Sequence, residues 1–255
     1  MMIYKDILRR IAVGERLLAV LLDPDKLQTD KVANLMEKVN QSIATHIFVG
    51  GSEVDEHVTP ILVAEIKKHT LLPVIIFPGD VSQISEKADA LLFLSLISGR
   101  NPDYLIGKQV QAVQKLREAN LEIIPTGYLL IENGKETAVQ RVTHTLPMSK
   151  DNVQNIVDTA KAGELLGMKL IYLEAGSGAI HPIDAEIIKK VKEDLKIPLI
   201  VGGGIRNMEA LTQAYTAGAD MVVIGTAFEQ DETFFERLQQ KEIILETPKP
   251  LNGFG

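Results

Sequence analysis

Eight short apolar runs, each as long as a β-strand, alternate along this chain with longer amphipathic stretches of helical length. The runs are continuously apolar and lack strict alternation, which is typical of parallel strands covered on both faces. Eight strands with interleaved helices in 255 residues favour an α/β fold of the closed (β/α)8, or TIM-barrel, type over an open doubly wound sheet. The candidate strands are residues 16–22, 46–50, 73–77, 90–97, 122–131, 169–174, 198–203 and 221–225.

Two connections depart from this regular rhythm of strand and helix. Only the stretch PGDVSQISEKAD, residues 78–89, separates the third strand from the fourth, and it is too short for a crossover helix with its two loops. We therefore expect a modified barrel in which the helix after the third strand is replaced by a loop. Conversely, residues 132–151 form a long polar insertion after the fifth strand, suited to a lid or a surface excursion. A single barrel domain over residues 1–255 accounts for the whole pattern.

Composition limits the classes of function. The absence of cysteine excludes disulfides and thiolate chemistry, and together with the lack of a hydrophobic signal segment near the N-terminus it predicts a cytoplasmic location. The formal net charge of −7 argues against nucleic acid as a partner, because neutralising phosphates requires a basic face. No apolar window is long enough to span a membrane, while peripheral membrane contact through a lipid-like substrate stays open.

Glycine-rich loops follow the last three candidate strands, in GSGA, VGGGIR and VVIGTAF. In a β/α barrel these loops lie at the C-terminal ends of the strands, where backbone N–H groups and helix N-termini form anion sites. Gly203 and Gly204, with Gly225 and Thr226, are therefore predicted to bind a phosphate group. The alternative is that these glycines only permit tight turns. Dinucleotide and Walker motifs are absent, since the third glycine of a GxGxxG pattern falls on His181 and no glycine precedes Lys-Ser or Lys-Thr.

Glu174 ends the sixth apolar run at the start of the first glycine loop. A carboxylate that is shielded from water beside a bound phosphate has a raised pKa and suits a general base. A structural glutamate that bonds the loop amides is the alternative. Tyr172, two residues earlier, points to the same side of the strand, so its hydroxyl either binds substrate or lies in the core.

The first strand ends in LLDPDK, residues 21–26, which carries two carboxylates and a lysine. Mg2+ is commonly held by one or two carboxylates together with phosphate oxygens of a substrate, and Asp23 leaves the strand directly toward the mouth of the barrel. Ser52, in VGGS after the second strand, offers a further oxygen. An Asp-Pro turn that caps a helix is the alternative reading of Asp23. Two anion sites across one mouth, one of them held through Mg2+, suggest group transfer between two phosphorylated small-molecule substrates.

Six motifs in chain order, LLDPDK, VGGS, PGD, YLEAGSGA, VGGGIR and IGTAFE, resemble those of the geranylgeranylglyceryl phosphate synthase family and its bacterial heptaprenyl relatives. The resemblance runs from about Leu17 to Phe228 and implies a modified TIM barrel that forms a homo-oligomer, a dimer or a hexamer. It also implies an Mg2+-dependent prenyltransferase, in which the C3 hydroxyl of sn-glycerol 1-phosphate attacks C1 of geranylgeranyl diphosphate. The product would be an ether-linked prenylglyceryl phosphate, which carries the first ether bond of archaeal-type lipids.

The resemblance further implies roles for individual residues. Asp23 and Ser52 would hold Mg2+ on the diphosphate, and Glu174 would take the proton of the attacking hydroxyl. Tyr104, on the helix after the fourth strand, would cap the prenyl pocket and limit chain length; an ordinary buried tyrosine is the alternative. Leu21 stands where the heptaprenyl branch often has lysine, which favours the geranylgeranyl donor. The glycerol phosphate ligands would be Tyr172, Leu173, Glu174, Ala175, Gly176, Ser177, Gly178, Gly203, Gly204, Gly225 and Thr226.

Two other functions fit the same barrel. A phosphosugar isomerase or aldolase would need a second acid–base residue on another strand or a Schiff-base lysine at a strand end, whereas Lys26 lies in a loop. A non-catalytic barrel that binds a phosphorylated metabolite would keep the glycine loops without needing Asp23 or Glu174.

Overall fold

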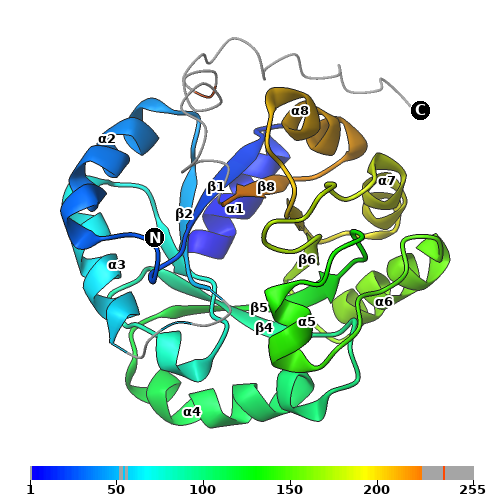
Figure 1. Cartoon of the computed structure of the whole chain (residues 1–255), viewed down its shortest axis with the longest axis horizontal. Coiled ribbons are helices and arrows are strands. Elements are labelled where there is room, and N and C mark those ends of the chain that lie inside the picture. The colour runs from blue at the N-terminus through cyan, green and yellow to red at the C-terminus, as the bar shows by residue number, and fades with distance from the viewer. Residues whose placement is uncertain (1, 52–53, 55–56, 226–237, 239–255) are drawn as a thin grey trace.

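Eight parallel strands close into a barrel in the order β1 to β8, as the apolar pattern predicts (Figure 1). The computed structural model describes residues 2–51, 54, 57–225 and 238 of the chain. Pairing of β1 with β8, with Leu18 opposite Val222, completes the circle and leaves no sheet edge. The strands are β1 (Leu17–Leu22), β2 (His46–Val49), β3 (Val74–Ile76), β4 (Ala90–Leu96), β5 (Glu122–Leu130), β6 (Leu170–Glu174), β7 (Leu199–Gly202) and β8 (Met221–Ile224).

Helices surround this barrel and fill most of the connections between strands (Figure 1). Between β3 and β4 the chain forms only the 3-10 helix Val81–Gln83, where the short connection left no room for a crossover helix. None of the helices in the described part of the chain has the length and apolar character needed to cross a bilayer. The α-helices are α1 (Ile3–Ala12), α2 (Val32–Gln41), α3 (Val58–His69), α4 (Lys108–Glu118), α5 (Ala138–Thr143), α6 (Val153–Leu165), α7 (Ala185–Asp194) and α8 (Met208–Ala217).

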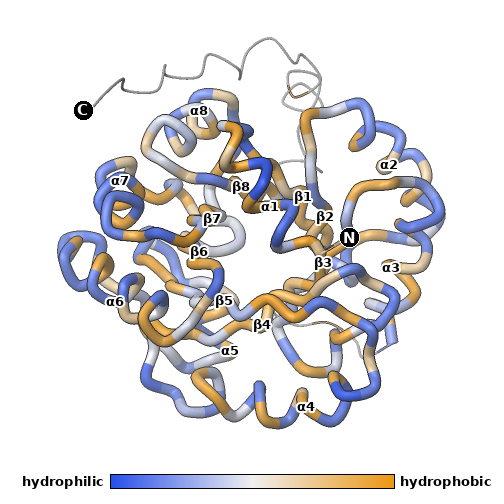
Figure 2. Tube along the Cα trace, turned by 180° about the vertical axis from the view of Figure 1, so that it is seen from behind, coloured by the Kyte–Doolittle hydropathy of each residue, from blue (hydrophilic) through white to orange (hydrophobic). Residues whose placement is uncertain are grey.

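Side chains of each strand alternate between the barrel interior and the layer under the helices. On β6, Tyr172 belongs to the interior cluster, whereas Ile171 and Leu173 belong to the cluster between strands and helices. Because both faces are covered, the strands are apolar throughout, and Figure 2 shows hydrophobic residues along the central strands with hydrophilic residues on the surrounding helices and loops. This alternation decides which residues of a strand end can reach a site inside the barrel.

The N-terminal end of the barrel is closed by α1. Ile3 and Ile7 of this helix join the interior cluster of the barrel. The carboxylate of Glu122, at the start of β5, accepts hydrogen bonds from the backbone N–H groups of Ile3 and Tyr4. It thereby satisfies donors that a helix N-terminus otherwise leaves free, and it places a negative charge where the helix dipole favours one. A site inside this barrel is therefore reached from the other end, at the C-terminal ends of the strands.

Candidate active site

A cavity of about 910 Å³ occupies the C-terminal end of the barrel. Its volume lies within the range typical of pockets that enclose small molecules. Residues at or just beyond the C-terminal ends of the strands line it, from Leu21 near the end of β1 round to Gly225 after β8. The cavity thus has the position in which β/α-barrel enzymes carry their active sites.

Three aromatic rings of the barrel interior form part of the cavity wall. Tyr172 stacks on Phe77 with ring centroids 5.2 Å apart and planes inclined by 8°, and Tyr128 lies 5.4 Å from Tyr172. The hydroxyl of Tyr172 is fully buried; it lies beside the Glu174 carboxyl group but has no well-aligned hydrogen-bond partner among the described residues. A buried polar group normally finds such a partner, so this hydroxyl is suited to bind a group that enters the cavity.

Glu174 projects into the same cavity from the last position of β6. Its side chain is 6% exposed, and Oε1 accepts a hydrogen bond of 2.6 Å from the backbone N–H of Gly176. Burial disfavours the charged form and raises the pKa of Glu174 to about 7, while the Gly176 hydrogen bond and the neighbouring Tyr172 hydroxyl limit the rise. At neutral pH this carboxyl group is therefore divided between its protonated and ionised forms, as a general acid–base group requires.

The glycine loops after β6 and β7 pack against each other and leave no room for side chains. Gly203, Gly204, Gly176 and Gly178 all have positive φ. A Cβ on Gly203 would lie 2.7 Å from the backbone nitrogen of Gly176 and 2.9 Å from that of Ala175. Glycine is thus required both by conformation and by space, and the bare backbone exposes N–H groups that can bind an anion.

The opposite side of the cavity is acidic and lysine-rich. Asp23 follows β1, and its Oδ2 lies 2.5 Å from the ammonium of Lys26. Asp80 and Lys108, from the connections after β3 and β4, form a second ion pair that lines the cavity. Burial would raise the pKa of Asp80, but the Lys108 hydrogen bond and backbone N–H groups lower it below its ordinary value.

The donor atoms on this side fit a hard cation such as Mg2+. Asp23 presents carboxylate oxygens to the cavity, and the Lys26 ammonium beside Oδ2 shows that a cation is accommodated there. Among the described residues no group of three or more acidic or histidine side chains forms a metal cluster. A single carboxylate can hold Mg2+ only together with other oxygens, and phosphate oxygens of a substrate commonly supply them.

The apolar part of the cavity extends along β4 toward α4 and α5. Leu92, Leu94 and Leu96 of β4 line it, together with Val139 and Val142 of α5. Tyr104, in the π-helical turn Asp103–Gly107 before α4, also lines it, and its hydroxyl donates a hydrogen bond of 3.2 Å to the carbonyl of Val142. One cavity therefore combines polar loops, a buried carboxyl group and a long apolar wall.

The structure brings together most of the residues singled out in the sequence. Leu173 and Ala175 are the exceptions, because their side chains lie in the layer between strands and helices. Ser52 and Thr226 lie outside the described residues. The predicted residues that line the cavity are Asp23, Tyr104, Tyr172, Glu174, Gly176, Ser177, Gly178, Gly203, Gly204 and Gly225.

Sequence patterns did not single out several charged residues of the cavity wall. Asp80 stands in the PGD motif just after β3, and Lys108 follows the end of β4 by a short helical turn. Lys135 and Arg141 come from the insertion after β5, and Arg206 from the loop after β7. Each follows a strand end, and this position is the signal by which it could have been found.

These features define a class of protein, a β/α-barrel enzyme in which glycine loops suited to bind an anion lie beside a buried carboxyl group. The sequence model of the PcrB family matches residues 11–244. The chain belongs to this family.

Three relatives show how far the similarity reaches. Geranylgeranylglyceryl phosphate synthase of Flavobacterium johnsoniae is 57% identical over 234 residues, which are 92% of this chain and 96% of the relative. The synthase of the same name from Korarchaeum cryptofilum is 40% identical over 93% of this chain and 98% of its own length. A crystal structure of (S)-3-O-geranylgeranylglyceryl phosphate synthase from Thermoplasma acidophilum, in complex with substrate sn-glycerol-1-phosphate, is 35% identical with a TM-score of 0.87. That comparison covers 94% of this chain and 96% of the other.

Proposed function

We propose that this chain is a prenyltransferase that joins geranylgeranyl diphosphate to the C3 hydroxyl of sn-glycerol 1-phosphate. The observation that carries the proposal is the position of Glu174, between the glycine loops and the apolar part of one cavity. Membership of the PcrB family and the names of its relatives support the same reaction. In this reaction the C3 oxygen forms a bond to C1 of the prenyl chain, the C1–O bond to diphosphate breaks, and diphosphate leaves.

Glu174 is the proposed general base. The attacking hydroxyl has a very high pKa and loses its proton late, as its oxygen bonds to carbon, so the base has to lie beside it in the transition state. The pKa of about 7 lets Glu174 accept that proton near neutral pH. Tyr172, whose buried hydroxyl lies beside Glu174 without a well-aligned hydrogen bond among the described residues, is proposed to hold glycerol phosphate in place.

The phosphate of the acceptor is proposed to bind the backbone of the glycine loops after β6, β7 and β8. Gly176 and Gly178, with Gly203, Gly204 and Gly225, line the cavity on this side. Thr226 is proposed to complete the site. Leu173 and Ala175 take part through the backbone of the loop that follows β6 and not through their side chains.

The diphosphate is proposed to bind on the acidic and lysine-rich side, with Mg2+ held by Asp23 and Ser52. When bound, Mg2+ would neutralise the charge that develops on the departing diphosphate. Lys26 and Lys108 line the same side of the cavity and can donate to the diphosphate oxygens. The allylic C–O bond then breaks with its leaving group surrounded by positive charge.

The prenyl chain is proposed to lie along the apolar wall formed by β4 and α5, with Tyr104 closing its far end. Leu21, also on the cavity wall, keeps an apolar side chain there and is consistent with the geranylgeranyl donor. We further expect a homo-oligomer, a dimer or a hexamer, with a cytoplasmic location and peripheral membrane contact when the lipid-like substrate or product is exchanged.

A product assay by mass spectrometry tests the function. Purified protein is incubated with geranylgeranyl diphosphate and Mg2+, and either sn-glycerol 1-phosphate or sn-glycerol 3-phosphate is added. We expect an ether product from the 1-phosphate alone, and its loss when EDTA removes the metal. Asp23→Asn should lower turnover about 100-fold or more, since charge stabilisation of a leaving group is usually a large catalytic effect.

The matched control is Asp158→Asn, which changes an exposed aspartate on α6. It should leave turnover within about twofold, because surface substitutions away from a site have small effects. Binding of glycerol phosphate without turnover of any prenyl donor would instead favour the non-catalytic barrel. A carbonyl substrate that becomes trapped on the protein by borohydride would favour the aldolase.

A further inference from the structure

The insertion after β5 is fastened to the glycine loop after β6 at successive positions. The side-chain amide of Asn133 donates a hydrogen bond to the carbonyl of Ala175. Thr137, which caps α5 through a reciprocal pair of hydrogen bonds with Gln140, fills the space that a Cβ on Gly176 would need. Both Asn133 and Thr137 are buried, so this part of the insertion is held in register with the loop.

Lys135 lies between these two anchors, and its side chain extends over the same loop. Its Nζ lies 3.9 Å from the position that a Cβ on Gly178 would take. Gly178 has a φ of +73° and lines the cavity together with Lys135. The ammonium group is therefore placed beside the glycine loop and on the wall of the cavity.

The charge of Lys135 is not neutralised within the part of the chain that the structure describes. Lys26 and Lys108, the other lysines of the cavity wall, are paired with Asp23 and Asp80. Lys135 forms no ion pair or hydrogen bond with any described residue. A cation held beside an anion-binding loop, with no carboxylate to compensate it, is suited to bind an anionic ligand.

We propose that Lys135 binds the phosphate group of the acceptor and makes the site selective for a phosphorylated acceptor. This inference rests on the proposed function. A phosphate monoester carries a charge between about −1.5 and −2 at neutral pH, and backbone N–H groups supply hydrogen bonds but no full positive charge. Lys135 supplies that charge from the insertion, which gives this insertion a role in recognition beyond covering the barrel.

Binding measurements on three variants test the proposal. Isothermal titration of sn-glycerol 1-phosphate, inorganic phosphate and glycerol is carried out on the wild type, Lys135→Gln, Lys135→Arg and Lys150→Gln. Lys150 is the matched control, an exposed lysine of the same insertion that does not line the main cavity. Because Lys135 is itself exposed, we expect all variants to fold, and thermal unfolding checks this.

We expect Lys135→Gln to raise the Kd of glycerol phosphate and of inorganic phosphate about tenfold, which corresponds to about 1.4 kcal/mol. Lys135→Arg should restore most of the affinity, and Lys150→Gln should not change it. In turnover, Lys135→Gln should raise KM for glycerol phosphate and leave KM for the prenyl diphosphate within about twofold. Equal affinity of the wild type and Lys135→Gln for both phosphate ligands overturns the proposal.

The outcomes separate this inference from the proposed function. If the wild type binds glycerol phosphate and Lys135→Gln weakens it, but no prenyl donor is turned over, Lys135 keeps its role and the transferase function fails. If turnover is found and Lys135→Gln leaves Kd and KM unchanged, only the inference about Lys135 fails. If the wild type binds neither glycerol phosphate nor inorganic phosphate, both are wrong.

Discussion

Glu174 places an ionisable group at a buried position, where a neutral side chain would cost less free energy on folding. The barrel interior around it is apolar, with Tyr172 and Tyr128 in the same cluster. Burial raises the pKa of the carboxyl group to about 7, so the protein holds a proton there that the unfolded chain releases at a lower pH. This cost is compatible with a catalytic role, because enzymes commonly obtain a base that works near neutral pH by burying a carboxylate.

The first prediction concerns the pH dependence of turnover. We expect kcat/KM for glycerol phosphate to rise with pH and to level off above about pH 7, because only the ionised form of Glu174 can accept the proton. Glu174→Gln should lower turnover roughly 100-fold to 10,000-fold, the usual contribution of a general base. Steady-state rates between pH 5.5 and 9 measure both effects.

The substrate also titrates in this range, since the second pKa of a phosphate monoester is about 6. The residual activity of Glu174→Gln provides the control. In this variant kcat/KM should still change near pH 6, where the substrate phosphate titrates, and should no longer change near pH 7, where Glu174 titrates in the wild type. A variant that retains more than a tenth of wild-type turnover, or a wild-type profile that is flat across pH 7, would show that Glu174 is a structural residue.

At the scale of elements, the strands were predictable because their burial on both faces requires continuous apolar runs. β3 is shorter than the run from 73 to 77, since its bounds depend on barrel pairing. The alternation on β6 directs Tyr172 and Glu174 into the barrel and Leu173 away from it. Leu173 entered the predicted ligand set through motif resemblance, which does not separate backbone contacts from side-chain contacts.

Contacts between loops were beyond sequence reasoning, because loops have no periodic pattern. Lys135 and Gly178 follow different strands, and their proximity depends on how the insertion packs on the neighbouring loop. The ion pair of Asp80 and Lys108 likewise joins two connections that meet only when the barrel closes. The sequence therefore predicted which strand ends form the site. The contacts between their loops, such as the ion pair of Asp80 and Lys108, became known only from the structure.

The second prediction concerns the π-helical turn before α4. Tyr104 fills part of the apolar cavity and bonds to Val142 of α5, so it joins two elements at the end of the proposed prenyl site. Tyr104→Ala should lengthen that site and raise the ratio of C35 to C20 donor turnover about tenfold or more, because added apolar contacts contribute to donor discrimination. Competition of the two prenyl diphosphates with product analysis measures the ratio.

Tyr104→Phe separates the bulk of the ring from its hydrogen bond. This variant keeps the aromatic ring and loses the bond to the Val142 carbonyl, so we expect it to keep the wild-type donor preference. If Tyr104→Ala also leaves the preference for C20 over C35 donors unchanged, Tyr104 does not limit chain length. If both variants change the preference equally, the position of α5 matters more than the ring.

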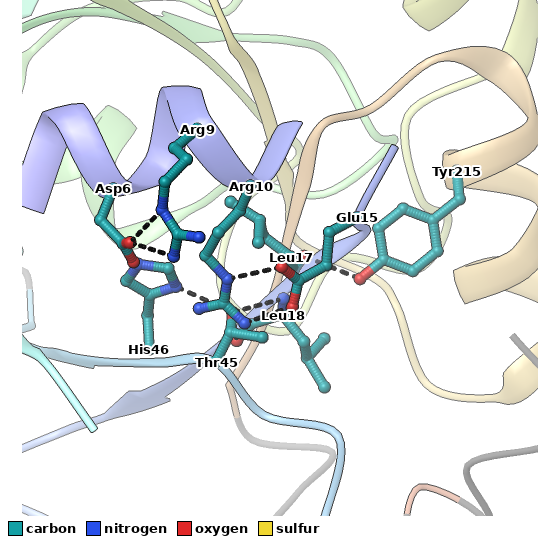
Figure 3. A network of polar contacts seen from close by, with 9 residues as sticks. All are labelled: Asp6, Arg9, Arg10, Glu15, Leu17, Leu18, Thr45, His46 and Tyr215. Carbon is teal, nitrogen blue, oxygen red and sulfur yellow. Dashed lines mark hydrogen bonds and ion pairs between the residues drawn. The ribbon is translucent and has the colours of Figure 1, made fainter. Parts of the chain in front are cut away.

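At the scale of the whole molecule, the two ends of the barrel carry different polar groups. The N-terminal end holds a network around α1, drawn in Figure 3. There Asp6 pairs with Arg9, Arg10 pairs with Glu15, and the Nδ1 atom of His46 lies 2.8 Å from the hydroxyl of Thr45. His46 is fully buried, and its Nε2 has no partner among the described residues.

Burial keeps His46 neutral. It lowers the pKa of the imidazole to about 3, and repulsion by Arg10 contributes, while Asp6 and Glu15 act in the opposite direction. The unfolded chain therefore binds a proton at His46 that the folded barrel excludes, between about pH 3 and pH 6.5. In this window the contribution of His46 to the free energy of unfolding increases with pH, because the unfolded state holds more protons.

Glu174 has the opposite effect at the other end of the barrel. Its folded pKa is about 7 and its model value is 4.5, so between these values the folded state holds the extra proton. Its contribution to the free energy of unfolding is therefore fully present below pH 4.5 and decreases as the pH rises to 7. Between pH 4.5 and 6.5 the two buried groups oppose each other, each with a slope of about 1.4 kcal/mol per pH unit.

The last prediction follows from this opposition. Relative to the wild type, Glu174→Gln should gain about 1.4 kcal/mol of unfolding free energy per pH unit between pH 4.5 and 6.5, and His46→Gln should lose about the same amount per unit. Urea denaturation across that range measures these differences, and subtraction from the wild type removes the titration of all other groups. Opposite slopes would show that both charges are excluded by burial. If the two differences in unfolding free energy have slopes of the same sign, or if one variant runs parallel to the wild type, water reaches at least one of the two side chains in the folded protein.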